Sequence, residues 1–425
     1  MRPRPGAGPS YDHEPGNRQR PEGQRDLGTL SRESARRVGF RPPPLRRLVA
    51  LTEAKVKEYG ATSRSCRASI RFRRAQPIRG ELDATFIVNK ESLATGTAEP
   101  PPAISVILVA TEDYALIRPA VRNLTAQRDA AIELVIPGPQ AVERSIRPED
   151  RADLATFAYW RHVVVPEGTR FDEARAAGVR AASAPIVAFA EDHSFPQPGW
   201  AAALVDAFQD GGVSVVGPVV ENGNPGSTVS WANFLLEYGE WMPPGRPDGR
   251  THLPGHNSAY RRELLLALGS RLTSMIESES VLHWQLARDG HRLKQEPRAR
   301  TRHMNFSRLR PSLALRYHLG RQFAANRAEQ WPGPKRAAYA AAFPLIAAVR
   351  VARVARTGVG SRALPAVIRA LPLVAVMVTV ASIGEAVGNI TRRAGSSAVF
   401  LNDIEHDRRR FMRNSERELW PVTSS

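Results

Sequence analysis

The sequence predicts an α/β fold in which a mostly parallel, Rossmann-like sheet carries helices on both faces. Short apolar runs of strand length alternate with helical stretches between residues 104 and 220, and strands that alternate with helices form parallel sheets through right-handed crossovers. A cluster of acidic and histidine side chains directly follows one of these runs at Glu191. Open α/β sheets bind ligands beyond the carboxyl ends of their strands, so this cluster marks a candidate site.

The individual elements follow from apolar runs that are bounded by Pro, Gly and polar residues. The run Ile104–Ala110 is the strongest strand, and Ala184–Ala190 has the short apolar pattern of a buried parallel strand. The other predicted elements of the sheet region are a helix over 118–127, strands over 132–136, 162–165 and 214–220, and a helix over 171–182.

Composition limits the classes of function. The single cysteine, Cys66, excludes a disulfide framework and a cysteine-rich metal site. The net charge is +18, and about +12 of it lies in residues 1–80, which hold 19 Lys and Arg against 7 Asp and Glu. This basic leader lacks interleaved aromatic residues, so we do not expect nucleic-acid binding. An anionic membrane surface is the better electrostatic partner.

The chain divides into five regions by composition. Residues 1–45 are rich in Arg and Pro and contain no apolar signal segment, so we expect a disordered leader and a cytoplasmic location. Two alternating stretches, 69–73 and 84–88, predict a hairpin of no assigned role. The predicted regions are a leader over 1–45, an extension over 46–100, a catalytic domain over 103–330, apolar helices over 331–390 and a charged, helical tail over 391–425.

Two apolar segments, 337–348 and 370–384, follow the predicted catalytic domain. The second has 15 uncharged residues, fewer than the roughly 18–20 that a helix needs to span a bilayer. Three alternatives stay open: helices that lie in the membrane interface, a transmembrane hairpin, and buried helices packed on the catalytic domain. Arginines at 350, 353 and 356 favour the interface. We therefore expect a peripheral or monotopic protein at the cytoplasmic face of the cell membrane.

The residues Glu191-Asp192-His193 are the strongest chemical signal in the chain. Carboxylates bind Mg²⁺ together with substrate phosphates, and an imidazole widens the choice toward Mn²⁺. The alternative is an exposed polar loop after a strand. The sequence around this cluster decides between the two.

In the order of its features, the segment 103–330 resembles the family 2 glycosyltransferases of GT-A fold. The strand 104–109 is similar to the family's opening strand. Ala174-Arg175-Ala176-Ala177-Gly178 resembles its Ala-Arg-Asn-x-Gly helix, and Glu191-Asp192-His193 falls where the family carries an Asp-x-Asp metal motif. The segment 277–282 resembles the helix that carries the catalytic base, and Arg302-His303 follows at the expected distance.

This resemblance implies a catalytic base and a metal site. Glu279 takes the position of the family's catalytic base, and Glu277 is the reserve candidate. Inverting transfer needs such a base to remove the proton of the acceptor hydroxyl; the alternative is that both carboxylates start a helix. Glu191, His193 and His303 are the expected ligands of Mn²⁺ or Mg²⁺.

The resemblance also implies contacts with the nucleotide sugar. The expected donor-site residues are Glu112, Asp113, Arg175, Gly178, Asp192, His256 and Asn257. The last two lie in a segment, 254–262, that resembles the family's acceptor-side turn, and turn residues placed for backbone reasons are the alternative. An aromatic stripe over 231–242 is read as core or as a stacking platform for a sugar. Arg321 and Arg327 are read as phosphate contacts or as surface ion pairs.

One departure from the family pattern concerns the second strand. Its end, Ile136-Pro137-Gly138-Pro139-Gln140, lacks the acidic residue that usually contacts the nucleotide. The resemblance then leaves Glu112, Asp113 or Glu133 to supply it.

The resemblance therefore implies an inverting, metal-dependent glycosyltransferase of cell-envelope polysaccharide biosynthesis. It would transfer a sugar from a nucleotide-diphosphate sugar to a glycan or lipid-linked acceptor. Two alternatives stay open: a related nucleotidyl or nucleotide-sugar transferase, and a catalytically inactive GT-A-like module that binds glycans or acts as a membrane scaffold.

Overall fold

The structure is a computed structural model that describes residues 86–87, 101–246, 249–277, 279–328, 331–359, 361–406 and 408–417. All of them belong to one unit, Arg71–Ser425. The predicted leader over 1–45 and nearly all of the extension over 46–100 lie outside the described residues. Of the predicted hairpin, only the pair Phe86–Ile87 is described, and it forms strand β1.

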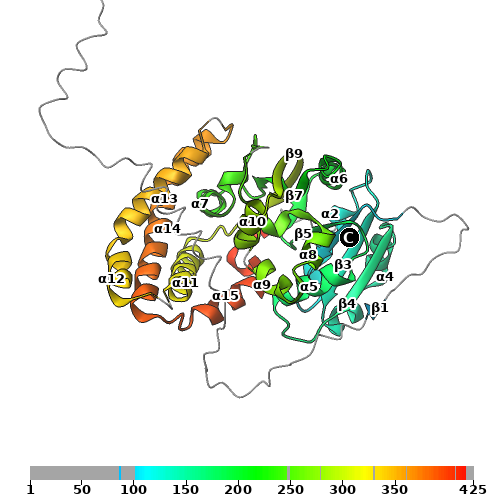
Figure 1. Ribbon diagram of the computed structural model, residues 1–425, viewed down its shortest axis with the longest axis horizontal. Helices are drawn as coiled ribbons and strands as arrows, with labels where there is room; N and C mark the ends of the chain where they lie inside the picture. The colour runs from blue at the N-terminus through cyan, green and yellow to red at the C-terminus, as the bar shows by residue number, and fades with distance from the viewer. Residues whose placement is uncertain are drawn as a thin grey trace, which may run out of the picture. The chain divides into compact units, whose positions relative to one another are not determined.

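A nine-stranded mixed sheet organises this unit, in the order β1-β4-β3-β2-β5-β8-β7-β9-β6 (Figure 1). The strands β4, β3, β2 and β5 are mutually parallel, as the sequence predicts. The rest of the sheet mixes parallel and antiparallel pairs. The bounds are β2 Ile104–Leu108, β3 Ile132–Gly138, β4 Tyr159–Val164, β5 Ile186–Ala190, β6 Ser194–Pro196, β7 Val213–Asn222, β8 Ala259–Arg261 and β9 Arg292–His303.

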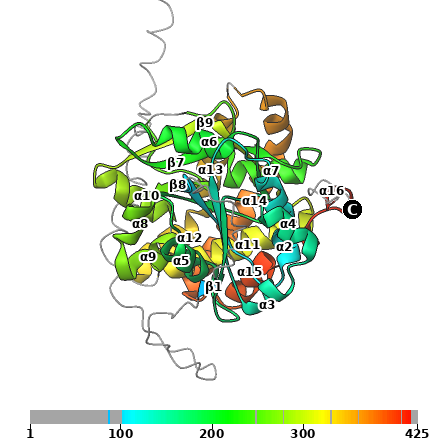
Figure 2. The same ribbon diagram turned by 90° about the vertical axis from the view of Figure 1, so that its right-hand side faces the viewer.

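Helices cover both faces of the sheet, which confirms the predicted fold class. Successive residues of β2 alternate between the two cores: Val106 and Leu108 pack in one, Ile107 in the other. Figure 2 shows α2 and α4 on one side of the strands, and α5, α8 and α9 on the other. The first set is α2 Tyr114–Leu124, α3 Gln140–Arg144, α4 Pro148–Leu154 and α6 Trp200–Ala207; the second is α5 Phe171–Ala181, α8 Arg262–Leu266, α9 Leu272–Glu277 and α10 Glu279–Arg288.

Strand β9 is an element that the sequence analysis does not predict. Its sequence, RLKQEPRARTRH, is rich in charge, and only one face of the strand is buried at its C-terminal end. Here the buried residues alternate with exposed arginines, as in a half-buried strand. The strand matters because it pairs with β6 and ends at His303.

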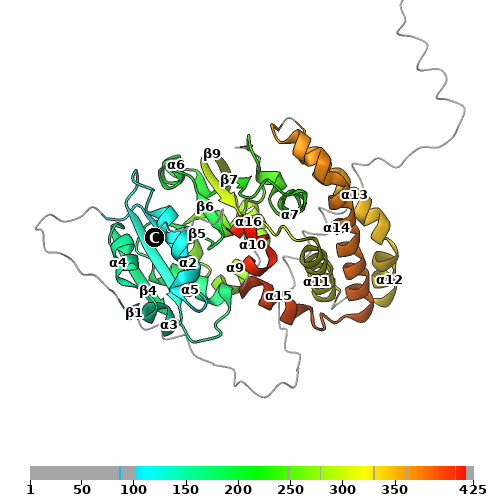
Figure 3. The ribbon, with the colours of Figure 1, turned by 180° about the vertical axis from the view of Figure 1, so that it is seen from behind.

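A layer of helices follows the sheet, formed by α11 Leu309–Arg327, α12 Gly333–Ala341, α13 Phe343–Thr357 and α14 Leu364–Thr391. Helices α11 and α14 approach closely because Gly320, Gly384 and Gly388 lie between them; a Cβ at each would overlap the backbone of the opposite helix. Figure 3 shows α15 (Ser397–His406) running from this layer back toward the sheet. A short α16, Asn414–Arg417, ends the described chain.

The helical layer and the sheet share a hydrophobic core. Val374 and Met377 of α14, together with Val354 of α13, pack with Phe234 of helix α7 (Thr228–Glu237) and with Val220 of β7. All five side chains are buried. The aromatic stripe over 231–242 contributes to this same core, which agrees with its interpretation as a core element.

Helix α14 has 28 residues and is long and apolar enough to cross a membrane, as judged by length and composition alone. It extends beyond the predicted apolar segment 370–384 at both ends and so includes two charged residues, Arg369 and Glu385. Glu385 is buried and forms ion pairs with Arg327 and Arg350. In this structure 39% of the most apolar part of α14 is buried, so the helix serves partly as a core helix. Helices α12 and α13 form a second apolar pair that is bent by 57°.

Candidate active site

Three side chains that the sequence analysis selects as metal ligands come together at the edge of the sheet. Glu191 and His193 lie in the turn between β5 and β6. Strand β6 pairs with β9 so that Ser194 stands opposite His303. One ligand atom from each of Glu191, His193 and His303 lies within 4.8 Å of the others.

The geometry of this metal cluster leaves room for a shared cation. His193 Nε2 lies 3.7 Å from Glu191 Oε1, and His303 Nε2 lies 3.9 Å from Glu191 Oε2. Asn257 donates a hydrogen bond of 2.9 Å from Nδ2 to Glu191 Oε2. The three candidate ligands are 4–5% or less exposed, so a cation there would be held away from bulk water.

The protonation states also fit a divalent metal. Burial lowers the pKa of His303 to about 3, so its imidazole is neutral at physiological pH. His303 Nδ1 hydrogen-bonds to Asn305 Oδ1 at 2.9 Å, while Nε2 is buried and has no partner in the described part of the chain. Burial opposes ionisation of Glu191, but the neighbouring His193 and His256 outweigh it and hold its pKa well below the usual range. A carboxylate and a neutral imidazole with a free lone pair are what a metal site requires.

A cationic side chain from the C-terminal segment already contacts this cluster. Arg408, the first residue of the short helix η6 (Arg408–Phe411), lies with Nη1 2.7 Å from His193 Nε2. A guanidinium can only donate, so it engages the lone pair of the nitrogen that faces Glu191. His193 Nδ1 in turn lies 2.6 Å from Asp192 Oδ1. Asp192 therefore orients His193 in this structure, and coordination through Nε2 requires Arg408 to move.

The predicted base, Glu279, is the first residue of α10 and lies beside the metal cluster. Its Oε2 lies 3.1 Å from His256 Nε2, and its Oε1 accepts a hydrogen bond of 3.2 Å from Arg175 Nη1. Burial raises the pKa of Glu279, although His256 and Arg175 oppose this. A Cβ at Gly255 would overlap the Glu279 carboxylate, so glycine is required for this approach.

His256 connects the base to the metal cluster. Its Nδ1 lies 3.3 Å from Glu191 Oε1, and its Nε2 faces Glu279. Burial lowers the pKa of His256, but Glu279 and Glu191 outweigh it, so the pKa is raised. The imidazole, which is about half exposed, thus stands between two carboxylates and links the base to the metal cluster.

Arg175, Glu279 and His256 are in contact with one another and together form the base cluster. The Arg175 side chain is almost fully buried between the rings of Phe171 and Phe189, at 4.7 and 5.3 Å from their centroids. Nη1 contacts Glu279 and His256, whereas Nε and Nη2 have no hydrogen-bond partner among the described residues. Buried guanidinium donors without partners are costly, so these two suit an anionic ligand.

Two other predicted site residues, Glu277 and Asp113, form an ion pair or a helix cap and do not face the clusters. Glu277, the reserve base, is 56% exposed and pairs with Arg170 at 2.7 Å. Asp113 caps helix α2 by accepting a hydrogen bond of 2.7 Å from the backbone nitrogen of Ala115. Glu112 is exposed near the end of β2. Asp113 is thus occupied as a helix cap. Glu112, the other acidic residue of this loop, has no hydrogen bond or ion pair within the described structure and is exposed.

Gly178 and Glu133 face the protein interior. A Cβ at Gly178 would lie 2.8 Å from the Ile107 side chain, so this glycine allows α5 to pack closely on the sheet. Glu133 is fully buried, pairs with Arg161 and accepts a hydrogen bond of 2.7 Å from the backbone nitrogen of Ser183. Of the predicted phosphate contacts, Arg327 pairs with Glu385.

Two residues at the site were not selected from the sequence. The ring of Tyr238 lies 4.3 Å from that of His303, and its hydroxyl donates to Glu191 Oε2 at 3.5 Å. Tyr238 belongs to the aromatic stripe, whose spacing of three to four residues was the available signal. Arg408 contacts a residue 215 positions away, and no local pattern marks it.

Comparison with known proteins finds a family match over part of the chain. Residues 105–269 match the sequence profile described as Glycosyl transferase family 2. Pre-mycofactocin glycosyltransferases from two strains of Mycobacterium tuberculosis are 29% identical to this chain over 153 residues, which are 35% of this chain and 33% of theirs. The chain thus spans about a third of the length of these curated relatives.

Solved structures of glycosyltransferases are similar to this chain at a lower level of identity. A mannosyltransferase from Pyrobaculum calidifontis in complex with GDP-Man and Mn²⁺ is 19% identical, with a TM-score of 0.42 over 74% of this chain and 91% of that one. Glucosyl-3-phosphoglycerate synthase from Mycobacterium tuberculosis is 19% identical, with a TM-score of 0.30 over 48% and 72%. Arg175, Glu191 and His256 lie inside the segment that matches the family profile. The match to the Glycosyl transferase family 2 profile thus spans residues 105–269, the part of the chain that holds these three side chains.

Proposed function

We propose that this protein is a metal-dependent, inverting glycosyltransferase that moves a sugar from a nucleoside-diphosphate sugar to an acceptor hydroxyl. The observation that carries the proposal is the contact between two clusters. His256 joins Glu191 of the metal cluster to Glu279 of the base cluster through contacts of 3.3 and 3.1 Å. The diphosphate leaving group at the metal cluster and the acceptor hydroxyl at the base cluster would therefore lie next to each other.

The donor would bind beyond the ends of β2 and β5. Arg175 offers its two buried donors, Nε and Nη2, to an anionic group of the donor. Mn²⁺ or Mg²⁺ held by Glu191, His193 and His303 would supply positive charge against the departing diphosphate. Glu112 is the exposed acid nearest the end of β2 in sequence and is the proposed contact to the nucleoside.

Glu279 would act as the general base. The acceptor oxygen attacks the anomeric carbon, the bond from this carbon to the diphosphate oxygen breaks, and the acceptor proton passes to the Glu279 carboxylate. Burial raises the pKa of Glu279, which makes the carboxylate a stronger base than a solvated glutamate. A single displacement of this kind inverts the anomeric configuration. His256, whose Nε2 faces the Glu279 carboxylate at 3.1 Å, would hold this carboxylate in place as a hydrogen-bond donor.

The acceptor is proposed to be a glycan or a lipid-linked molecule that is reached from a membrane surface. Helix α14 is apolar, and several large side chains of the helical layer, such as Ile368 and Val376, are about half exposed. Arginines of α13 lie on the same layer. An exposed apolar helix beside cationic side chains suits contact with anionic head groups at the cytoplasmic face of the cell membrane.

Calorimetric titration tests the proposal. Uridine, guanosine and thymidine diphosphate sugars are titrated with Mn²⁺, with Mg²⁺ and with chelator. We expect one donor to bind in the presence of metal and to bind weakly after chelation. Folded protein that binds no donor would contradict the proposal and favour the alternative, an inactive GT-A-like module. If transfer is observed, the anomeric configuration of the product, measured by NMR, tests the inverting mechanism.

A further inference from the structure

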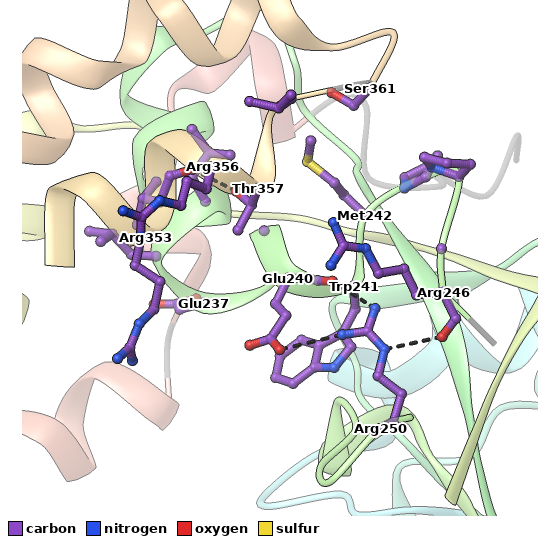
Figure 4. A pocket seen from close by; sticks show the side chains of 18 of the residues that line it. Glu237, Glu240, Trp241, Met242, Arg246, Arg250, Arg353, Arg356, Thr357 and Ser361 are labelled. Atoms are coloured by element: carbon purple, nitrogen blue, oxygen red, sulfur yellow. Dashed lines mark hydrogen bonds and ion pairs between the residues drawn. The ribbon is translucent and has the colours of Figure 1, made fainter. Parts of the chain in front are cut away.

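A cavity of about 620 Å³ lies where the sheet meets the helical layer (Figure 4). One wall is the end of α7 with helix η3 (Gly239–Trp241) and the loop that follows it, up to His252. The opposite wall is the C-terminal end of α13 with residues up to Ser361. The cavity therefore joins two parts of the chain that are more than a hundred residues apart.

The charge of this cavity is positive. Figure 4 shows Arg353 and Arg356 on one side, and Arg246 and Arg250 on the other. The two lining carboxylates are already engaged: Glu237 pairs with Arg316 at 2.7 Å, and Glu240 lies 3.4 Å from Arg250 Nη1 and 3.3 Å from His252 Nε2.

Three of the arginines are available to a ligand. Arg246, Arg353 and Arg356 are exposed and form no ion pair within the part of the chain that the structure describes. Cations that outnumber the carboxylates of one cavity, and that form no ion pair among the described residues, favour an anionic ligand, and guanidinium groups suit phosphate above all.

Gln295 of strand β9 contacts the segment that carries Arg246 and Arg250. Gln295 of β9 is fully buried and accepts hydrogen bonds from Arg246 N at 2.9 Å and from Arg250 Nη2 at 2.7 Å. Its Nε2 donates to the backbone oxygen of Trp241 at 3.0 Å. One buried amide thus fixes three points of this wall.

The interior and the exit of the cavity are apolar. Leu235, Met242 and Val354 line it and are buried. Val359, at the rim, is 71% exposed, and Ile368, in the first turns of α14, is 56% exposed. An apolar chain could therefore leave the cavity along α14 while its charged end stays at the arginines.

The cavity adjoins the candidate active site. Tyr238, whose ring contacts that of His303, directly precedes the lining residue Gly239. His252 lines the cavity, and four residues later His256 contacts Glu279. The same segment thus presents one set of residues to the cavity and another to the two clusters.

From these observations we infer that the cavity is the binding site for the acceptor's anionic end, and that the acceptor is a phosphate-bearing amphiphile. This inference rests on the proposed function and specifies the acceptor class. The arginines hold the phosphate, the apolar wall holds the first carbons of the chain, and the acceptor hydroxyl reaches Glu279.

Direct binding measurements on the full chain test the inference. Octyl phosphate, octyl glucoside and inorganic phosphate, all below any micellar concentration, are titrated into protein that holds Mn²⁺ and a nucleotide-sugar donor. We expect octyl phosphate to bind more tightly than the other two probes. Replacing Arg353→Gln and Arg356→Gln together should weaken it roughly tenfold, at about threefold for each exposed cation–anion contact.

Two controls make the result decisive. Arg369→Gln removes one exposed arginine of α14 that does not line the cavity, and it should leave octyl phosphate binding unchanged. Arg246→Gln tests the opposite wall independently, with an expected loss of about threefold. Equal binding of octyl phosphate by all variants, or an equal loss in Arg369→Gln, would overturn the inference.

The remaining outcomes separate the two proposals and the two sources of phosphate. If donor binding is normal and octyl phosphate does not bind, the acceptor inference is wrong while the proposed function stands; if the donor does not bind, the proposed function itself fails. Binding to phosphatidylglycerol vesicles is measured in parallel. If the arginine variants bind vesicles more weakly than the unmodified protein while all variants bind monomeric octyl phosphate equally, that result would assign the arginines to the bilayer surface and overturn the inference.

Discussion

Arg408 gives the sharpest test of the metal cluster. In the structure its guanidinium donates to His193 Nε2 at 2.7 Å, and this nitrogen is the one that faces Glu191. A metal that coordinates Nε2 must first displace this hydrogen bond. Replacing Arg408→Gln removes both the charge and the length of the side chain, so the lone pair of Nε2 becomes accessible without displacement.

The magnitude follows from the contact that is lost. Hydrogen bonds that involve a charged group are worth about 1.5–3 kcal/mol, so the variant should bind Mn²⁺ roughly 10–150 times more tightly in the absence of nucleotide. The dissociation constant is measured by electron paramagnetic resonance titration of free Mn²⁺ at constant ionic strength. Because removal of one positive charge also favours a cation at long range, a control of equal charge is required.

Arg410→Gln is this control, because Arg410 lies in the same short helix but packs over the ring of Phe411 at 5.4 Å. It should change Mn²⁺ affinity by less than about twofold, as expected for an exposed charge that is screened by salt. Equal affinity in Arg408→Gln and the unmodified protein would refute the reasoning, as would an equal gain in both variants. Either result would mean that Arg408 does not compete for the ligand nitrogen.

Three further predictions concern the base, the helical layer and pH. Glu279→Gln should lower the transfer rate by at least about a hundredfold without changing the donor dissociation constant, and Glu277→Gln, the matched control, should leave both unchanged. Gly384→Ala should lower the free energy of unfolding by about 2 kcal/mol, because its Cβ would overlap the backbone of α11 and this overpacking exceeds the gain in helix propensity; Gly333→Ala, with no atom nearer than 3.9 Å, should not. Burial, reinforced by His252, lowers the pKa of His283 from 6.5 to about 3, so between these values the unfolded chain binds the proton. The stabilisation from neutral His283 is therefore complete above about pH 6.5 and falls by about 1.4 kcal/mol for each pH unit below it.

Each of these predictions has its own contradicting result. Measurable transfer by Glu279→Gln at the unmodified rate would place the base elsewhere. Equal melting temperatures for the two glycine variants would show that α11 and α14 do not pack as described. For the histidine, the unfolding free energy is measured at pH 6.5 and 5 in the unmodified protein and in His283→Gln; the loss in the unmodified protein should be larger by about 2 kcal/mol, and identical losses would contradict the assignment.

The parts of the site that the sequence predicts are those tied to a strand end or to a local motif. Glu191 and His193 directly follow a strongly apolar strand, and the carboxyl end of such a strand faces the ligand crevice. Glu279 and His303 were placed by their order relative to this strand. The position of His303 beside Glu191 depends on β9, which pairs with β6 and whose charged sequence hides its strand pattern. Glu279 reaches the site from α10, and Gly255 allows its close approach.

The expectations for Asp113 and Gly178 differ from the structure because the same residue type can either bind a ligand or stabilise the fold. Asp113 follows a strand as a ligand-binding acid would, but its side chain satisfies the first turn of α2. Gly178 stands in a motif, but the space for its Cβ is occupied by the sheet. Arg408 depends on the path of the C-terminal segment, a tertiary feature that periodicity and spacing do not encode.

The shared core between the sheet and the helical layer has a practical consequence for how this protein can be handled. Val220 and Phe234 of the sheet side pack with Val374 and Met377 of α14, so a fragment that stops near residue 330 would expose an apolar face and lose one wall of the arginine-lined cavity. Truncation would therefore disturb folding as well as the proposed membrane contact, and it cannot test either one alone. Detergent-free preparations are better sought by polar substitution at Ile368 and Val376, whose side chains are about half exposed. The sheet and the helical layer are in this sense two faces of one packed unit.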